Sequence, residues 1–216
     1  DGELICNFQT MDKSNLGYIK QVNTGYPDFE FAIFVTSEML SLMSFLNNDI
    51  AIEFEKNSSG EITTLIITDG ENSIRYTTAS IEIIEEVPRV ANEPEYDVKI
   101  VLDHNFVNNY IGAISALPSS EYFTIISNGK KTELVMNYNK TKGNQIKFRV
   151  DTVDDEHFET DSEMIVKVPF IKEVLTANKI FQSGEFLISK EGLLKIKITH
   201  EDFTANYFVM LQNNKN

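Results

Sequence analysis

The feature that most constrains the fold is a strand-then-helix pattern that occurs three times along the chain. The three stretches begin with FEFAIFVTSEML at Phe29, YDVKIVLDHNFV at Tyr96 and EMIVKVPFIKEVL at Glu163. The differences 96 − 29 and 163 − 96 are both 67 residues. In each stretch, apolar residues first alternate with period two and then recur with helical spacing. Equal spacing predicts a structural unit that is repeated within the chain.

Each predicted helix has a start signal and is followed by three strand-like runs. Thr36 or Ser37 is expected to cap the first helix and Asp103 the second, and Pro169 suits the first turn of the third. The runs cover 50–55, 62–68 and 73–78, then 121–127, 132–138 and 145–150, then 185–189, 193–199 and 205–211. Each unit is therefore predicted to be βαβββ, which places the chain in the α+β class.

Residues 1–28 are predicted to be the end of a fourth, earlier unit. DGELI at 1–5 matches SGEFL at 183–187, which follows the third helix. The first strand and helix of that unit would then precede residue 1. Four units suggest two domains: an N-terminal domain at 1–84 and a C-terminal domain at 96–216. The connector between them, EEVPRVANEPE at 85–95, contains two prolines that oppose strand pairing, and it is either a solvated linker or a binding segment.

The charge balance and the single cysteine limit the possible partners and compartments. The chain has 19 Lys and Arg against 33 Asp and Glu, a net charge of −14, which argues against indiscriminate nucleic-acid binding. It has no apolar run of 18 residues or more, so no membrane partner is expected. Cys6 alone excludes an internal disulfide and fits an intracellular, reducing compartment.

The sequence contains no recognisable catalytic motif. His104, His157 and His200 are scattered, without Cys or carboxylate residues at metal-ligand spacing. The acidic run DTVDDEHFETD at 151–161 is the best metal candidate, but it lacks the spacing of a calcium loop. A solvated link between two units is the expected role of this run. We therefore expect no enzyme, no cofactor and no bound metal.

Several segments resemble the sliding clamps of DNA replication. NFQTMDKSNLGYI at 7–19 is similar to a clamp segment with a Met-Asp-x-Ser turn, and TSEMLSLMSFLNNDIAI at 36–52 is similar to the second-helix segment of the family. FTANYFVMLQ at 203–212 is similar to the carboxy-terminal clamp strand with paired aromatics. These matches are to clamps of the proliferating cell nuclear antigen type. FEFAIFVTSEML at 29–40 also resembles the T-even-type phage clamps.

The resemblance implies the DNA-clamp fold, with two domains per chain, and a processivity factor that encircles duplex DNA. Such a ring is a homotrimer with helices lining its hole and sheets outside. It holds DNA topologically and without sequence preference, so weak backbone electrostatics suffice. The resemblance also implies a clamp loader, a DNA polymerase and other replication proteins as partners. Lys172 and Lys179 match basic positions of the last helix, and Asn108 and Asn109 are polar candidates for phosphate contacts.

The same resemblance implies a hydrophobic pocket in which partner proteins insert a short peptide. By position, this partner-peptide pocket would be lined by Met11 and Leu16 from the turn, Val87, Pro88 and Val90 from the connector, and Phe208, Val209 and Leu211 from the last strand. Exposed Met and aliphatic side chains suit a site that accepts several peptides. The alternative is that all eight side chains fill the core.

The resemblance also implies subunit contacts between an edge strand of each domain, which by position are 73–80 and 145–150. Their candidate interface residues are Arg75, Tyr76, Lys147 and Arg149. Strand addition at two different edges is a heterologous interface, which closes a ring when the rotation fits. The alternative is that these side chains simply face solvent.

Two other functions agree with parts of the sequence. The first is a monomeric polymerase accessory factor with the same fold, which would need a basic face. The second is a virion or structural β-protein whose repeat only mimics a clamp. The Asn- and Ile-rich composition suggests an AT-rich genome, such as that of a phage or other virus. Replication would then take place in the host cytoplasm for a phage, or in the nucleus or a viral factory for a eukaryotic virus.

Overall fold

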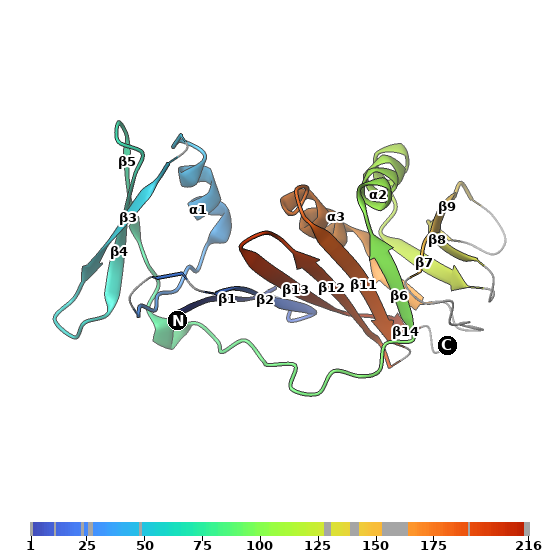
Figure 1. Cartoon of the computed structure of the whole chain (residues 1–216), viewed down its shortest axis with the longest axis horizontal. Coiled ribbons are helices and arrows are strands. Elements are labelled where there is room, and N and C mark those ends of the chain that lie inside the picture. Colours follow the sequence, from blue (N-terminus) through green and yellow to red (C-terminus); the bar gives the residue numbers. More distant parts are fainter. Residues whose placement is uncertain are drawn as a thin grey trace. The chain divides into compact units, whose positions relative to one another are not determined.

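The structure is a computed structural model of the chain (Figure 1). It describes residues 2–10, 12–22, 24–25, 28–47, 49–127, 131–138, 143–152, 164–189 and 191–213. Contacts between residues divide the chain into two compact units. Unit 1 contains Glu3–Thr24 together with Val87–Asn216, and unit 2 contains Gly25–Glu86. Each unit is described separately.

Unit 1 holds two antiparallel sheets and two helices. The first sheet has the strand order β1-β2-β13-β12-β11-β6, and the second has the order β14-β10-β7-β8-β9. The elements are β1 (Glu3–Gln9), β2 (Asn15–Val22), β6 (Val98–Leu102), α2 (His104–Ala116), β7 (Tyr122–Ser127), β8 (Thr132–Met136), β9 (Ile146–Val150), β10 (Met164–Lys167), α3 (Val168–Ala177), β11 (Ser183–Ser189), β12 (Leu193–Thr199), β13 (Phe203–Met210) and β14 (Gln212–Asn213).

The N-terminal hairpin β1–β2 belongs to the same sheet as the C-terminal strands. Seven residue pairs join β2 to β13, with Leu16 opposite Phe208 and Ile19 opposite Ala205. The hairpin therefore groups with residues 87–216 in unit 1. The predicted N-terminal domain instead grouped it with 25–84, and that division into clamp domains stays a prediction.

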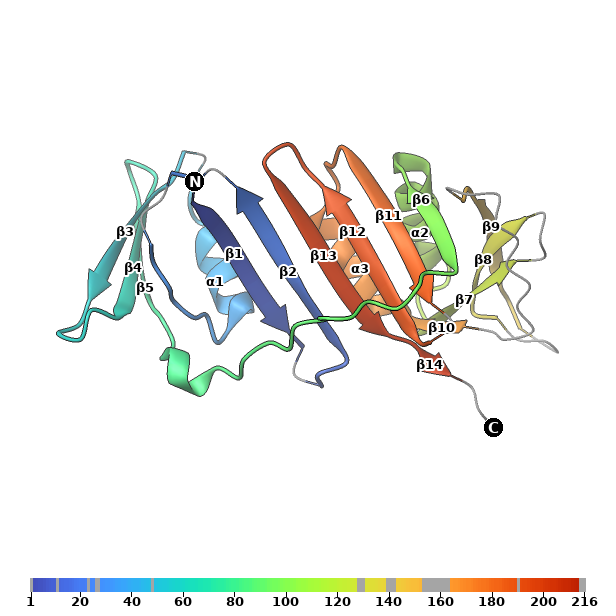
Figure 2. The same ribbon diagram turned by 60° about the horizontal axis from the view of Figure 1, so that its bottom comes forward.

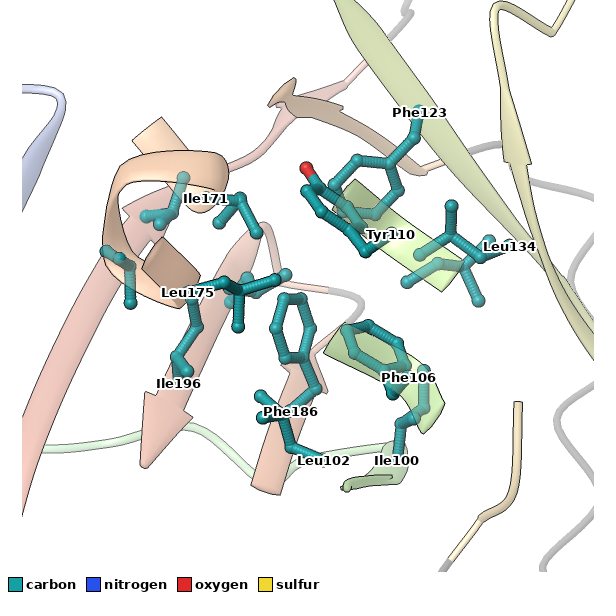
Figure 3. Packing of buried hydrophobic residues seen from close by; sticks show 14 of the residues in the cluster. Ile100, Leu102, Phe106, Tyr110, Phe123, Leu134, Ile171, Leu175, Phe186 and Ile196 are labelled. Atoms are coloured by element: carbon teal, nitrogen blue, oxygen red, sulfur yellow. The ribbon is translucent and has the colours of Figure 1, made fainter. Parts of the chain in front are cut away.

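The core of unit 1 lies where helices α2 and α3 meet the sheets (Figure 3). Phe106 of α2 packs on Phe186 of β11 with a ring separation of 5.3 Å. Tyr110 meets Phe123 of β7 edge to face at 5.6 Å, and its hydroxyl donates a hydrogen bond of 3.3 Å to the carbonyl of Val168. Helix α2 thus contacts both sheets and the first residue of α3.

Unit 2 is a smaller assembly with its own core. It contains α1 (Thr36–Met43), the sheet β3 (Ala51–Lys56), β4 (Ile62–Thr68) and β5 (Ser73–Thr77), and the 3₁₀ turn η1 (Ile81–Ile83). The centre of its core is formed by Leu65 and Ile67 of β4. Phe29 and Phe31 pack on Phe54 at ring separations of 4.9 and 6.1 Å.

The α+β class predicted from the sequence is confirmed, but two local predictions are wrong. The first repeat lacks its predicted opening strand, because the only pairing of the stretch 29–35 is a single bridge between Ala32 and Ala79. The N-cap of α1 is Val35, which offers no side-chain hydrogen bond, rather than Thr36 or Ser37.

The start signals of the other two helices are confirmed. Asp103 caps α2 by accepting a 2.7 Å hydrogen bond from the backbone N–H of Phe106. Pro169 is the second residue of α3. Among the described residues, no helix is both long and apolar enough to cross a bilayer.

Removing the cap of α2 should measurably destabilise unit 1. We expect Asp103→Ala to lower the free energy of unfolding by about 1 kcal/mol, because the N–H of Phe106 loses its acceptor. Asp103→Asn keeps a capping oxygen and should retain most of the stability. Urea unfolding of both variants beside the parent chain measures the difference. Equal losses in the two variants would contradict a capping role.

Candidate functional site

The connector crosses one face of the six-stranded sheet (Figure 2). Residues 85–97 form no helix or strand, and the part of the connector in unit 1 runs across β13 and β12 to the start of β6. The core cluster lies against the opposite face of this sheet. We call the face beneath the connector the outer face.

Period-two alternation decides which side chains reach the outer face. In β13, Ala205, Tyr207 and Val209 belong to the core cluster, so Phe208 and Met210 point to the outer face. The register places Leu16 of β2 and Lys195 of β12 on either side of Phe208. These side chains form the floor beneath the connector.

The structure separates the eight predicted pocket residues. Leu16 and Phe208 are neighbours on the outer face, whereas Val209 and Leu211 are buried in the core cluster, so these two do not line the outer face. The physical reason at Val209 is that successive strand residues point to opposite faces, so Phe208 and Val209 cannot share one. From the connector, Val87 and Val90 are half-buried and Pro88 is exposed. Met11 lies outside the described residues.

A polar network attaches the connector to this floor. The ammonium of Lys195 bonds both carboxylate oxygens of Glu93 at 2.7 and 2.8 Å, and the Tyr96 hydroxyl donates to Glu93 at 2.9 Å. The same ammonium lies 5.3 Å from the centroid of the Phe208 ring. Tyr18 of β2 packs on Phe208 at 5.9 Å. Phe208 is only 2% exposed although it points away from the core cluster.

The network also perturbs the two phenols beside Glu93. Burial, the hydrogen bond to Glu93 and the negative charge of Glu93 raise the pKa of Tyr96. Burial and the same charge raise the pKa of Tyr18. Both phenols are therefore held in the protonated form, and Tyr96 can act as a hydrogen-bond donor to Glu93.

Sequence analysis missed the polar half of this site. Tyr18, Glu93, Tyr96 and Lys195 were not among the predicted pocket residues. Alternation along β13 was a usable signal for Met210, which is 63% exposed and shares the outer face with Phe208. No local signal pairs Glu93 with Lys195, because the two residues are far apart in the chain.

The tip of the β1–β2 hairpin is built around Asp12. Its Oδ1 accepts hydrogen bonds from the hydroxyls of Thr10 and Ser14, both at 2.7 Å, and from the backbone N–H of Ser14 at 3.0 Å. The predicted polar turn is therefore a side-chain-stabilised turn, and it leads directly into β2 at Asn15.

The predicted DNA-facing residues lie on solvent-exposed parts of the helical layer. Asn108 and Asn109 are exposed on α2, and Lys172 is exposed on α3. Lys179 is exposed two residues beyond the end of α3. None of the four has a role in the core of unit 1, so all are free to contact an external ligand.

Both predicted interface strands lie at sheet edges. Among the described strands, β5 pairs only with β4, and β9 pairs only with β8. Lys147 and Arg149 are exposed on β9. Tyr76 is 7% exposed and belongs to the core of unit 2, so its assignment to the interface disagrees with its position.

Arg75 has a partner within unit 2. Its guanidinium bonds both carboxylate oxygens of Glu55, at 2.6 and 2.5 Å, on the face of the sheet opposite the core. This side-chain hydrogen bonding holds the pKa of Glu55 below its usual value.

The described residues contain no cluster of three or more His, Cys, Asp or Glu side chains that could hold a metal ion. Most of the acidic run at 151–161 lies outside the described residues, since only 151 and 152 are described.

Comparison with known proteins identifies the fold. No family model and no curated protein sequence matches the chain. Among solved structures, it matches A. fulgidus PCNA bound to the C-terminal region of FEN-1, with a TM-score of 0.71 and 11% identity over 99% of this chain and 91% of that chain. The fold is that of the DNA sliding clamps.

Two further sliding-clamp structures support the same assignment. The PCNA2–PCNA3 complex from Sulfolobus tokodaii matches with a TM-score of 0.68 and 12% identity, over 97% of this chain and 90% of that chain. PCNA from Thermococcus kodakaraensis matches with a TM-score of 0.66 and 11% identity over the same shares. The fold is thus shared at a sequence identity of 11–12%. At this identity the functional residues of this chain have to be inferred from its own geometry.

The attachment of the connector should depend on alkaline pH. The fold raises the pKa of Tyr96 above its ordinary value of 10.0. The contribution of the protonated Tyr96 hydroxyl to folding stability is therefore fully present below pH 10.0. It is lost as the pH rises through the raised pKa. We expect Glu93→Gln to lower the pKa of Tyr96, since a charge and a strong acceptor are removed. Ultraviolet titration against a Tyr96→Phe reference measures this shift.

Glu95→Gln is the matched control, because it removes an exposed carboxylate from the same segment. An equal shift of the Tyr96 pKa in both variants would contradict the specific contact with Glu93.

Proposed function

We propose that this chain is a DNA sliding clamp, a processivity factor that encircles duplex DNA and tethers replication proteins to it. The observation that carries the proposal is the clamp fold, matched over 99% of the chain. Its role is to bind and hold, without catalysis, at the site of DNA replication.

The charge distribution supports a topological rather than a tight hold on DNA. The chain carries a net charge of −14, whereas the predicted helical segments hold only three acids (Glu38, Asp103 and Glu173) and two bases (Lys172 and Lys179). A ring of such chains would have most of its negative charge outside the helical layer, where it repels DNA. Lys172, Lys179, Asn108 and Asn109 are proposed to make the phosphate contacts.

Ring closure is proposed to use the two edge strands in a homotrimer. Strand β5 of one subunit would pair with β9 of the next, which satisfies backbone groups left open at both edges. Lys147 and Arg149 are the proposed side-chain contacts, together with Arg75 if its bond to Glu55 rearranges.

The outer face beneath the connector is the proposed attachment surface for partner peptides. A. fulgidus PCNA was solved with the C-terminal region of FEN-1 bound, and the present chain shares its fold. Leu16, Phe208 and Met210, with Val87, Pro88 and Val90 of the connector, are proposed to contact the apolar anchors of such peptides. A DNA polymerase and a clamp loader are the proposed principal partners.

Size-exclusion chromatography with light scattering tests the ring directly. We expect a native mass near 3 × 24.6 = 73.8 kDa for the chain, plus any native sequence that precedes it. Loaded trimers should remain on closed circular DNA in high salt and slide off the same DNA after linearisation, because only topology resists salt.

The alternatives give different results in the same experiment. A monomer that binds circular and linear DNA equally would indicate the accessory factor. Absence of any effect on DNA would indicate the structural protein. Either result would overturn the clamp proposal.

Lysines on the helical layer should control the salt dependence of DNA binding. We expect Lys172→Glu and Lys179→Glu each to reduce the slope of log K against log salt by about 1, because each removes one phosphate contact. Lys197→Glu is the matched control, since Lys197 is exposed on the outer face of β12. An equal effect of all three variants would exclude the helical layer as the DNA-facing surface.

A further inference from the structure

The bond between Glu93 and Lys195 lies next to Phe208 on the outer face. The side chain of Lys195 is 12% exposed and that of Glu93 is 28% exposed, so the lysine is mostly covered while the carboxylate remains open to water. The Lys195 ammonium lies over the Phe208 ring at 5.3 Å. Phe208 is therefore covered from above by this pair, and from the side by Tyr18.

Because Glu93 bonds the Lys195 ammonium that lies over Phe208, a peptide that packs on this ring has to compete with Glu93. Once Glu93 leaves, the Lys195 ammonium loses its counter-ion beside the apolar ring of Phe208. A partly buried charge that loses its partner is unfavourable. A peptide that supplies a carboxylate at the same position removes this penalty, whereas a neutral or basic peptide does not.

We infer that Lys195 selects partner peptides that carry a carboxylate next to an aromatic anchor, and that Glu93 is an internal competitor for the same position. This inference rests on the proposed function of the outer face as a peptide-binding surface. The carboxylate of the peptide replaces Glu93 at Lys195, and the aromatic ring packs among Tyr18, Phe208 and Met210.

The connector already presents this combination of groups. Glu93 bonds Lys195, and three residues later the half-buried Tyr96 donates its hydroxyl to Glu93. The segment thus occupies the surface as a tethered ligand with an acid and an aromatic. A tethered ligand has a high effective concentration, so the unmodified chain resists weak peptides.

A synthetic copy of the connector tests the inference. The probe is the peptide NEPEYDV, copied from 92–98, together with the version NQPEYDV in which the first acid is an amide. With the Glu93→Gln chain, we expect the acidic peptide to bind about tenfold more tightly than the amide version. The unmodified chain should bind both peptides weakly. Isothermal titration calorimetry at low salt measures all four affinities.

Two matched variants show whether Lys195 is responsible. Lys195→Met, added to Glu93→Gln, should abolish the preference for the acidic peptide, whereas Lys197→Met in the same background should leave it intact. Glu95→Gln in place of Glu93→Gln should not release the site. Circular dichroism confirms that each variant is folded before its affinities are compared.

The inference is overturned if the Glu93→Gln chain binds both peptides equally or binds neither. It is also overturned if the preference for the acidic peptide persists without Lys195. These outcomes leave the mass and DNA-retention results untouched, so a failure of the peptide preference can be told apart from a failure of the clamp proposal.

Discussion

Backbone pairing between β2 and β13 is the interaction on which the rest of unit 1 depends. It joins the N-terminal hairpin and the C-terminal strands into one sheet, with Leu16 opposite Phe208. Gly17 permits this pairing, because a Cβ at that position would lie 2.5 Å from both the Asn206 carbonyl oxygen and the Phe8 ring. No other residue type could allow such a close approach without displacing the strands.

Strand β13 serves the core and the outer face at once. Its odd-numbered residues pack among the core residues of both sheets and of α2 and α3, and its even-numbered residues form the floor beneath the connector. This arrangement supports the candidate site on a rigid element, since the same strand is fixed by buried side chains on its other face. The connector itself has no such support and is attached by Glu93 and Tyr96.

Local patterns predicted most elements of the fold, because periodicity and caps act within a few residues. Each of the nine predicted strand runs coincides with a strand that differs by only a few residues at its ends, and Asp103 caps α2 as expected. The stretch 29–35 was predicted as a strand and is not one. Alternation of apolar and polar residues permits a strand, but a strand forms only where a neighbouring strand pairs with it, and this stretch has a single bridge. Tyr76 and Val209 were assigned to surfaces although alternation with their neighbours places them inward.

The sequence by itself determined the α+β class, the order of the elements and the apolar character of β13. It also contained the segments that resemble the sliding clamps, since turns and amphipathic helices are specified by residues that are close together in the sequence. Only the tertiary structure decided which face of β13 meets the connector and that Lys195, over a hundred positions away, neutralises Glu93. The physical reason is that strand register and long-range ion pairs depend on which segments meet in space, and no local pattern specifies that meeting.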